Sequence, residues 1–283
     1  MEAMVRIVWT SVLLLLSVGV SADVVLLSSS PSKVASSLQA LLAKRLSTPV
    51  QLISNVNQPL HYERYELAIA VGVEALKDYS VPKSLPLIAA FVSQTEYQMY
   101  SDRLSSAVFV EPPMERQLRL AEAILGEQRE YGVLVQKQAS ADVLRSGVNV
   151  YVVEEFETLN HALIKLLAEN QALIGVYDPQ LYSPNNIKNI LITAYRHIRP
   201  LIGPSSAYLR AGALATTYSD LNDVAERLSE IALRYKNKGD WIKADFNPYF
   251  RVGFNEQVGR SLNLLLPDID DVTRTLHQRE ESE

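Results

Sequence analysis

Cysteine is absent from the 283 residues, and this absence excludes several kinds of chemistry. Disulfide bonds, thiolate catalysis, cysteine-type zinc sites and iron–sulfur clusters all need a residue that the chain lacks. A cysteine that would carry an N-terminal lipid is missing as well. The four histidines lie far apart, with no spacing typical of metal ligands, so we expect no metal site; they are His61, His161, His197 and His277.

Glycine is also scarce, and its 11 copies are scattered along the chain. The motifs GxGxxG, GxxxxGK[ST], GxSxG and HExxH do not occur. Dinucleotide binding, P-loop nucleotide hydrolysis, the hydrolase elbow and zinc proteolysis therefore have no support. We therefore expect no cofactor and no catalytic residue. An enzyme is still considered, as the third possible function, because a catalytic site assembled from residues far apart in the sequence follows no motif.

Positive charge is in deficit, with 27 Lys and Arg against 32 Asp and Glu, which gives a net charge of −5. Such a field repels polyanions, so nucleic acid is not an expected partner. Hydrophobic residues make up 48% and charged residues 21% of the chain, as is typical of a globular protein with a sizeable core.

The one long apolar run, 7–20, follows Arg6 and is followed by Val20-Ser21-Ala22. At ~14 residues the run is shorter than the ~20 that a membrane span needs. Small residues before Asp23 are typical of a signal-peptidase site. We expect residues 1–22 to be a cleaved signal peptide and the mature chain to be a periplasmic protein that is neither lipidated nor integral to the membrane. The alternative is an uncleaved anchor or a core helix.

Short continuous apolar runs alternate with amphipathic segments along the rest of the chain. Runs at 23–27, 67–71 and 131–135 predict buried strands, whereas 221–235 has the spacing of a helix that Ser219 or Asp220 caps. This alternation is typical of parallel sheets covered on both faces. About ten strands exceed the ~5–6 of an ordinary sheet. We therefore predict an α/β protein of two Rossmann-like lobes, with a charged break at 127–130 between them.

Polar residues follow the predicted strands in both halves, where open α/β sheets bind their ligands. Hydroxyl and backbone N–H groups at 28–30 suit an anion, although one serine here would equally well cap the next helix. Together these positions predict a binding cleft between the lobes. The candidate residues are Ser28, Ser29, Gly72, Ser93, Glu111, Gln136, Tyr177, Asp178, Ser205 and Ser206.

From about Tyr65 to Pro267 the chain resembles the solute-binding components of bacterial ABC transporters, in the type I periplasmic-binding-protein-like family that includes binders of aromatic amino acids. The stretches that carry the resemblance are Leu85-Pro-Leu-Ile followed by Phe91-Val-Ser, 113–120, 131–135, Tyr177-Asp178, 209–215 leading to Tyr218, 250–255 and 264–267.

The resemblance implies two lobes joined by a three-strand hinge, with lobe 1 formed by 23–127 plus 217–240 and lobe 2 by 128–216 plus 241–283. It implies ligand contacts at Gly72, Ser93, Asp178 and Ser205 or Ser206, and we add Tyr218. Asp178 would hold a ligand ammonium, with Tyr177 or Phe91 stacked on an apolar part. The alternative for Asp178 is a turn residue before Pro179.

The sequence departs from the family pattern in three places. Val73 replaces a hydroxyl residue, Gln94 replaces an acidic one, and 53–67 has room for a loop but not for the customary helix. We predict a non-enzymatic solute-binding protein that delivers a small polar or amino-acid-like ligand to an ABC permease. The alternative is a periplasmic sensing or interaction protein that regulates a membrane sensor.

Overall fold

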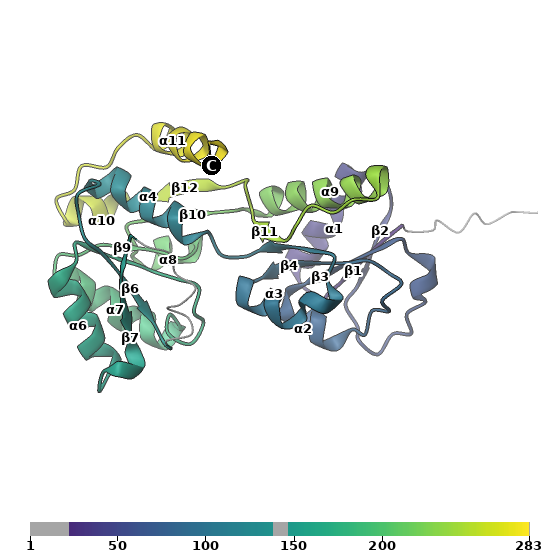
Figure 1. Cartoon of the computed structure of the whole chain (residues 1–283), viewed down its shortest axis with the longest axis horizontal. Helices are drawn as coiled ribbons and strands as arrows, with labels where there is room; N and C mark the ends of the chain where they lie inside the picture. Colours follow the sequence, from purple (N-terminus) through teal and green to yellow (C-terminus); the bar gives the residue numbers. More distant parts are fainter. Residues whose placement is uncertain (1–22, 138–146, 283) are drawn as a thin grey trace, which may run out of the picture.

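The computed structural model describes residues 23–137 and 147–282, so the expected signal peptide lies outside the described residues. Within these residues the strands form two six-stranded sheets, each the centre of one lobe (Figure 1). The prediction of two α/β lobes with parallel sheets is confirmed.

The sheet of lobe 1 is entirely parallel, in the order β11-β5-β4-β3-β1-β2. Its strands are β1 (Val24–Leu27), β2 (Val50–Ile53), β3 (Leu67–Val71), β4 (Leu87–Val92), β5 (Ser106–Phe109) and β11 (Asp245–Phe246). One face is covered by α1 (Lys33–Leu46) and α9 (Leu221–Lys238), and the other by α2 (Gly72–Asp78) and α3 (Gln94–Tyr100) (Figure 1).

The sheet of lobe 2 has the order β12-β10-β9-β8-β6-β7, and only the pair β10 and β12 is antiparallel among its described strands. The strands are β6 (Tyr131–Val135), β7 (Asn149–Val152), β8 (Ala172–Ile174), β9 (Leu201–Ile202), β10 (Ala215–Tyr218) and β12 (Arg251–Phe254). One face is covered by α4 (Met114–Leu125), α10 (Glu256–Ser261) and α11 (Ile269–Glu281), and the other by α6 (Leu159–Glu169), α7 (Pro184–Arg196) and α8 (Ser206–Ala211).

The strands and helices form where the sequence pattern predicts them because the local signals agree with the packing. All four residues of β1 are buried, as expected of a strand with helices on both faces. Asp220 caps α9 through a capping box with Asp223. For α1 the cap is Ser32, whose Oγ accepts the Ala35 N–H at 3.0 Å. The alternative that one of the serines at 28–30 caps this helix is therefore wrong.

Three crossovers join the lobes: 110–113 leads from β5 to α4, 219–220 from β10 to α9, and 247–250 from β11 to β12. They correct the expected lobe boundaries. Residues 114–127 belong with lobe 2, because Leu120 and Ala121 of α4 are buried in the core of the second sheet. Residues 217–218 extend β10 in that same sheet, whereas 241–246 pack on lobe 1 and supply β11. The charged break at 127–130 is an ordinary turn between a helix and a strand.

Two further segments, one between β2 and β3 and one at the C-terminal end of the described chain, have defined structures. Between β2 and β3 the chain forms only a 3₁₀ turn, Tyr62–Arg64, which confirms that this segment contains no full helix. The acidic C-terminal segment forms α11, which packs on α4 and β12 through Val272 and Leu276.

Candidate functional site

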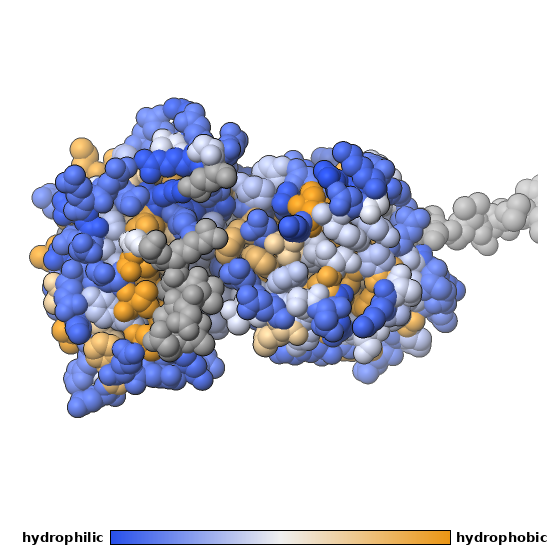
Figure 2. All heavy atoms as spheres, in the orientation of Figure 1, coloured by the Kyte–Doolittle hydropathy of each residue, from blue (hydrophilic) through white to orange (hydrophobic). Residues whose placement is uncertain are grey.

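A cleft with a volume of about 1160 Å³ lies between the two lobes; we call it the interlobe cleft. Its walls come from α3, the crossovers 110–113 and 247–250, the first turns of α4, the loop after β8, and the last turns of α11. The surface of both lobes is mostly hydrophilic in this view (Figure 2). This volume lies just above the ~300–1,000 Å³ that ligand pockets usually enclose, so the cleft has room for a small molecule.

Glu111 lies in the first crossover and lines the cleft. Its Oε1 accepts the backbone N–H of Gln94 at 2.7 Å, at the N-terminus of α3. Its Oε2 is shielded from solvent and accepts no hydrogen bond from the residues that the structure describes. Burial raises the pKa of the Glu111 carboxyl above its ordinary value, and the nearby Glu96 carboxylate adds to this effect.

Tyr177 and Asp178 follow β8 and line the cleft from lobe 2. Tyr177 is 41% exposed, and its pKa is raised by burial and then by the charges of Glu96 and Glu111, which belong to lobe 1. Asp178 Oδ1 accepts the N–H groups of Gln180 and Leu181 at 3.0 and 2.9 Å. The turn-forming role considered for Asp178 is thus present, and it coexists with a position in the cleft.

Ser93 is buried beside the cleft and is the N-cap of α3. Its Oγ accepts the Glu96 N–H at 3.1 Å, while Glu96 accepts the Ser93 N–H at 2.7 Å. This capping box uses Ser93 to hold α3 in place, so that Gln94 faces the cleft.

The other predicted residues lie near strand ends or within strands, and they do not line the interlobe cleft. Ser28 donates to the carbonyl of Ser30 at 2.8 Å, and the Oγ of Ser29 is buried without a described partner. Phe91 lies at a bulge in β4 with φ 56° and packs toward the α1 and α9 core. The remaining positions are Gly72 at the start of α2, Gln136 after β6, Ser205 and Ser206 at the start of α8, and Tyr218 at the end of β10.

Sequence reasoning missed the contribution of α4 and α11 to the cleft wall. Arg116 of α4 is 3% exposed and pairs with Glu280 of α11, with Nε–Oε1 and Nη2–Oε2 distances of 2.6 and 2.9 Å. Arg116 also donates to the Asn247 carbonyl at 3.0 Å, and its guanidinium lies 3.9 Å from the centre of the Phe250 ring. These contacts fix the third crossover to lobe 2. The available signal was Arg116, which lies on the helix face that also buries Leu120 and Ala121.

Lobe 1 is fixed to the crossovers by a second set of polar contacts. Ser219 Oγ donates to the Tyr249 carbonyl at 2.6 Å, which ties the second crossover to the third. Arg251 pairs with Asp220 and Asp223 at 3.0 and 3.1 Å. The Tyr249 hydroxyl bonds to Glu230 of α9. The hinge therefore has defined contacts on both sides of the cleft.

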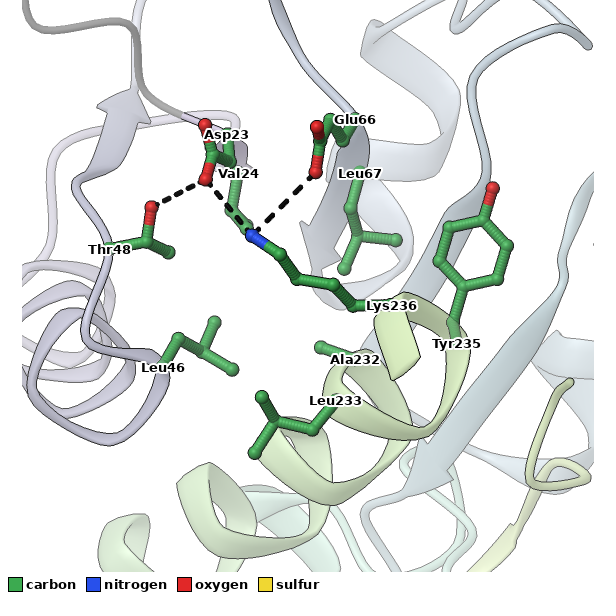
Figure 3. Close-up of a pocket in the computed structure, with 10 residues that line it drawn as sticks. All are labelled: Asp23, Val24, Leu46, Thr48, Glu66, Leu67, Ala232, Leu233, Tyr235 and Lys236. Atoms are coloured by element: carbon green, nitrogen blue, oxygen red, sulfur yellow. Dashed lines mark hydrogen bonds and ion pairs between the residues drawn. The ribbon is translucent and has the colours of Figure 1, made fainter. Parts of the chain in front are cut away.

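A second cavity, at the amino-terminal ends of β1 and β3, is too small for a solute. It has a volume of about 40 Å³, enough for a few waters at most, and contains the Lys236 ammonium between Asp23 and Glu66 (Figure 3). Thr48 donates to Asp23 at 2.8 Å, and this bond, followed by Lys236, holds the pKa of Asp23 below its ordinary value. These contacts anchor the start of β1.

Two searches of the described residues bear on the class of site. Across 23–137 and 147–282, no group of three or more His, Asp or Glu side chains is arranged to hold a metal ion. In the same part of the chain, no helix combines the length and the apolar character that crossing a membrane requires.

Solved structures with the same two-lobe architecture identify the fold. A ligand-free, open substrate-binding protein with adhesive properties from Clostridium difficile aligns with a TM-score of 0.63 and 13% identity, over 87% of this chain and 95% of that one. This chain has the type I periplasmic-binding-protein fold. The ABC domain in complex with L-Trp from Streptococcus pneumonia aligns with a TM-score of 0.57 and 11% identity, over 90% and 98% of the two chains. A conserved domain protein from Vibrio cholerae aligns with a TM-score of 0.53 and 11% identity, over the same shares.

The sequence matches no protein-family model and no curated protein. The resemblance seen in the sequence is therefore confirmed at the level of the fold, and a function for this periplasmic-binding-protein fold has to be argued from its own cleft.

Proposed function

We propose that this protein is a periplasmic solute-binding protein that captures a small polar or amino-acid-like ligand between its lobes and delivers it to an ABC importer. The observation that carries the proposal is the interlobe cleft, which is large enough for a small molecule and is lined by residues from both lobes and the crossovers. A ligand that contacts both walls stabilises the closed arrangement, because each lobe then gains contacts that the open protein lacks.

Three connecting segments suit this motion. Each crossover is short, and the contacts of Arg116, Ser219 and Tyr249 lie at their ends, so the lobes rotate as bodies about fixed points. The structures of a substrate-binding protein and of an ABC domain in complex with L-Trp, which share the fold, support the same kind of role.

A ligand screen tests this function. Amino acids, amines and small metabolites are added to the purified protein, and thermal unfolding and small-angle scattering are recorded. A ligand at a hundredfold excess over its Kd should add ~2.7 kcal/mol of stability and reduce the radius of gyration. If no compound does either, the solute-binding function is refuted.

Asp178 provides the matched variants. Asp178→Asn keeps the Oδ1 acceptor for Gln180 and Leu181 but removes the charge, whereas Asp102→Asn makes the same change outside the cleft. We expect the first variant to weaken an ammonium-containing ligand about tenfold or more and the second to have no effect. Equal affinities in both variants would contradict a ligand contact at Asp178.

Export and partner are tested in cells. Cleavage before Asp23 predicts that the protein in a periplasmic extract begins at Asp23, which N-terminal sequencing measures. Cross-linking in the presence of the ligand then distinguishes transport from sensing, because capture of an ABC permease supports delivery and capture of a sensor protein supports regulation.

A further inference from the structure

The charged groups of the interlobe cleft indicate which solutes it accepts. Its lining contains six carboxylates, Glu111, Glu115, Asp178, Asp245, Glu280 and Glu281, against the two guanidiniums of Arg116 and Arg119. Arg116 and Glu280 pair with each other, which leaves five carboxylates in the lining against the guanidinium of Arg119. A cleft whose lining has an excess of one charge concentrates the opposite charge, so this one attracts cations and repels solutes with a net negative charge.

Glu111 supplies an independent and more local observation. One of its oxygens is held by Gln94, and the other is enclosed without a donor among the described residues. An enclosed and unpaired carboxylate oxygen costs free energy that a donor would recover. A hydroxyl group donates a hydrogen bond but leaves the negative charge uncompensated. An ammonium group donates a hydrogen bond and also compensates the charge. Rotation of the Glu111 side chain toward the cleft that it lines would exchange an unpaired oxygen for a charge-assisted bond.

The opposite wall is suited to the same group. Asp178 brings a second carboxylate, from lobe 2, and its backbone contacts involve Oδ1. Tyr177, beside it, offers an aromatic face, a favourable neighbour for an ammonium. Closing the lobes without a cation would bring like charges together. Met114 and Phe246 in the lining can contact an alkyl or aryl portion of the solute.

We propose that the solute is a small organic amine with a net positive charge, and that Glu111 is the residue that binds its ammonium group. This inference rests on the proposed function, because it names the solute class of the same cleft. Burial raises the pKa of the Glu111 carboxyl in the ligand-free protein, and a bound ammonium would lower it again.

A series of probes that differ chiefly in charge tests the inference by titration calorimetry. Diaminopentane, aminopentanol, pentanediol and glutarate share a five-carbon chain and carry two positive charges, one, none and two negative charges. We expect affinity to fall in that order, with no heat from glutarate, and we expect added salt to weaken the amines. Binding of pentanediol or glutarate as tight as that of diaminopentane would overturn the assignment.

Glu111→Gln adds a residue-level test. The substitution keeps an acceptor for the Gln94 N–H and should weaken diaminopentane about tenfold to a hundredfold, the worth of one hydrogen bond to a charged group. Glu127→Gln is the control, since Glu127 is exposed and lies outside the cleft. If the Glu111→Gln variant binds diaminopentane as tightly as the parent protein does, the role of this residue is refuted. If the substitution impairs folding, the probe series still tests the solute class, because it uses the parent protein.

The same titrations separate the two levels of the proposal. Zwitterionic amino acids and neutral sugars are measured beside the amines. If they bind and the amines do not, solute binding stands and the cationic class is refuted. If none of the compounds binds, the proposed function fails and the inference fails with it.

Discussion

The ion pair between Arg116 and Glu280 should stabilise lobe 2 far more than an exposed pair would. Removing one partner of a buried pair costs ~3–5 kcal/mol, because the other charge stays buried without compensation. The Arg116 side chain is only 4% exposed, whereas that of Glu280 is 25% exposed, so water partly reaches the site. We therefore expect Glu280→Ala to lower the free energy of unfolding by about 3 kcal/mol, at the lower end of this range.

Urea-induced unfolding, followed by circular dichroism, measures the loss. Glu281→Ala is the matched control, because it removes the next carboxylate of the same helix and lies exposed at its end; its expected effect is below ~0.5 kcal/mol. Since Arg116 is almost fully buried, salt at about 1 M should change the difference little.

The pairing also predicts non-additivity. Arg116→Met alone should be destabilising, because the Asn247 carbonyl and the Phe250 ring lose their partner. In the double variant the loss should be smaller than the sum of the two single losses, because contacting residues couple. Additive losses, or a Glu280→Ala variant within ~0.5 kcal/mol of Glu281→Ala, would refute the reasoning.

Two further predictions concern single side chains. Gly132→Ala should cost about 1–3 kcal/mol, since the added Cβ would lie 2.5 Å from Leu166 Cγ in a filled core; a change below ~0.5 kcal/mol in urea unfolding would contradict this. Glu111→Gln should gain stability relative to the parent as pH rises. The raised pKa means that the folded protein binds the proton more tightly, so the parent loses stability as pH rises from the ordinary pKa of 4.5 through the folded value. Urea unfolding of the ligand-free proteins at pH 4.5 and pH 7 measures the difference in free energy of unfolding between variant and parent. The same difference at both pH values would contradict the prediction.

The sequence predicted the two-lobe fold well, because short-range patterns determined it. Fully apolar runs such as 24–27 identified buried parallel strands, and Asp220 marked the start of α9. The lobe boundaries were less predictable. Helix 114–125 packs on the second sheet because Leu120 and Ala121 are buried in the core of that sheet. An amphipathic stripe predicts that one face of a helix is buried, but it does not predict which sheet that face contacts.

The candidate site was likewise predicted only in part from the sequence. Position after a strand pointed to Glu111, Tyr177 and Asp178, all three of which line the interlobe cleft. The same rule selected Ser28, Gly72 and Ser206, which lie at strand ends outside it, because the rule gives the edge of a sheet and not the direction in which a side chain points.

The chain by itself determined what chemistry is absent, namely thiols, phosphate-binding loops and a positive field, and it determined the alternation of strands and helices that makes two lobes. These are local properties, readable from composition and periodicity. Only the tertiary structure decided that Arg116 meets Glu280 across 164 positions and that one oxygen of Glu111 is enclosed without a donor from the described part of the chain. Such pairings depend on how helices and crossovers pack in space, where residues far apart in sequence become neighbours.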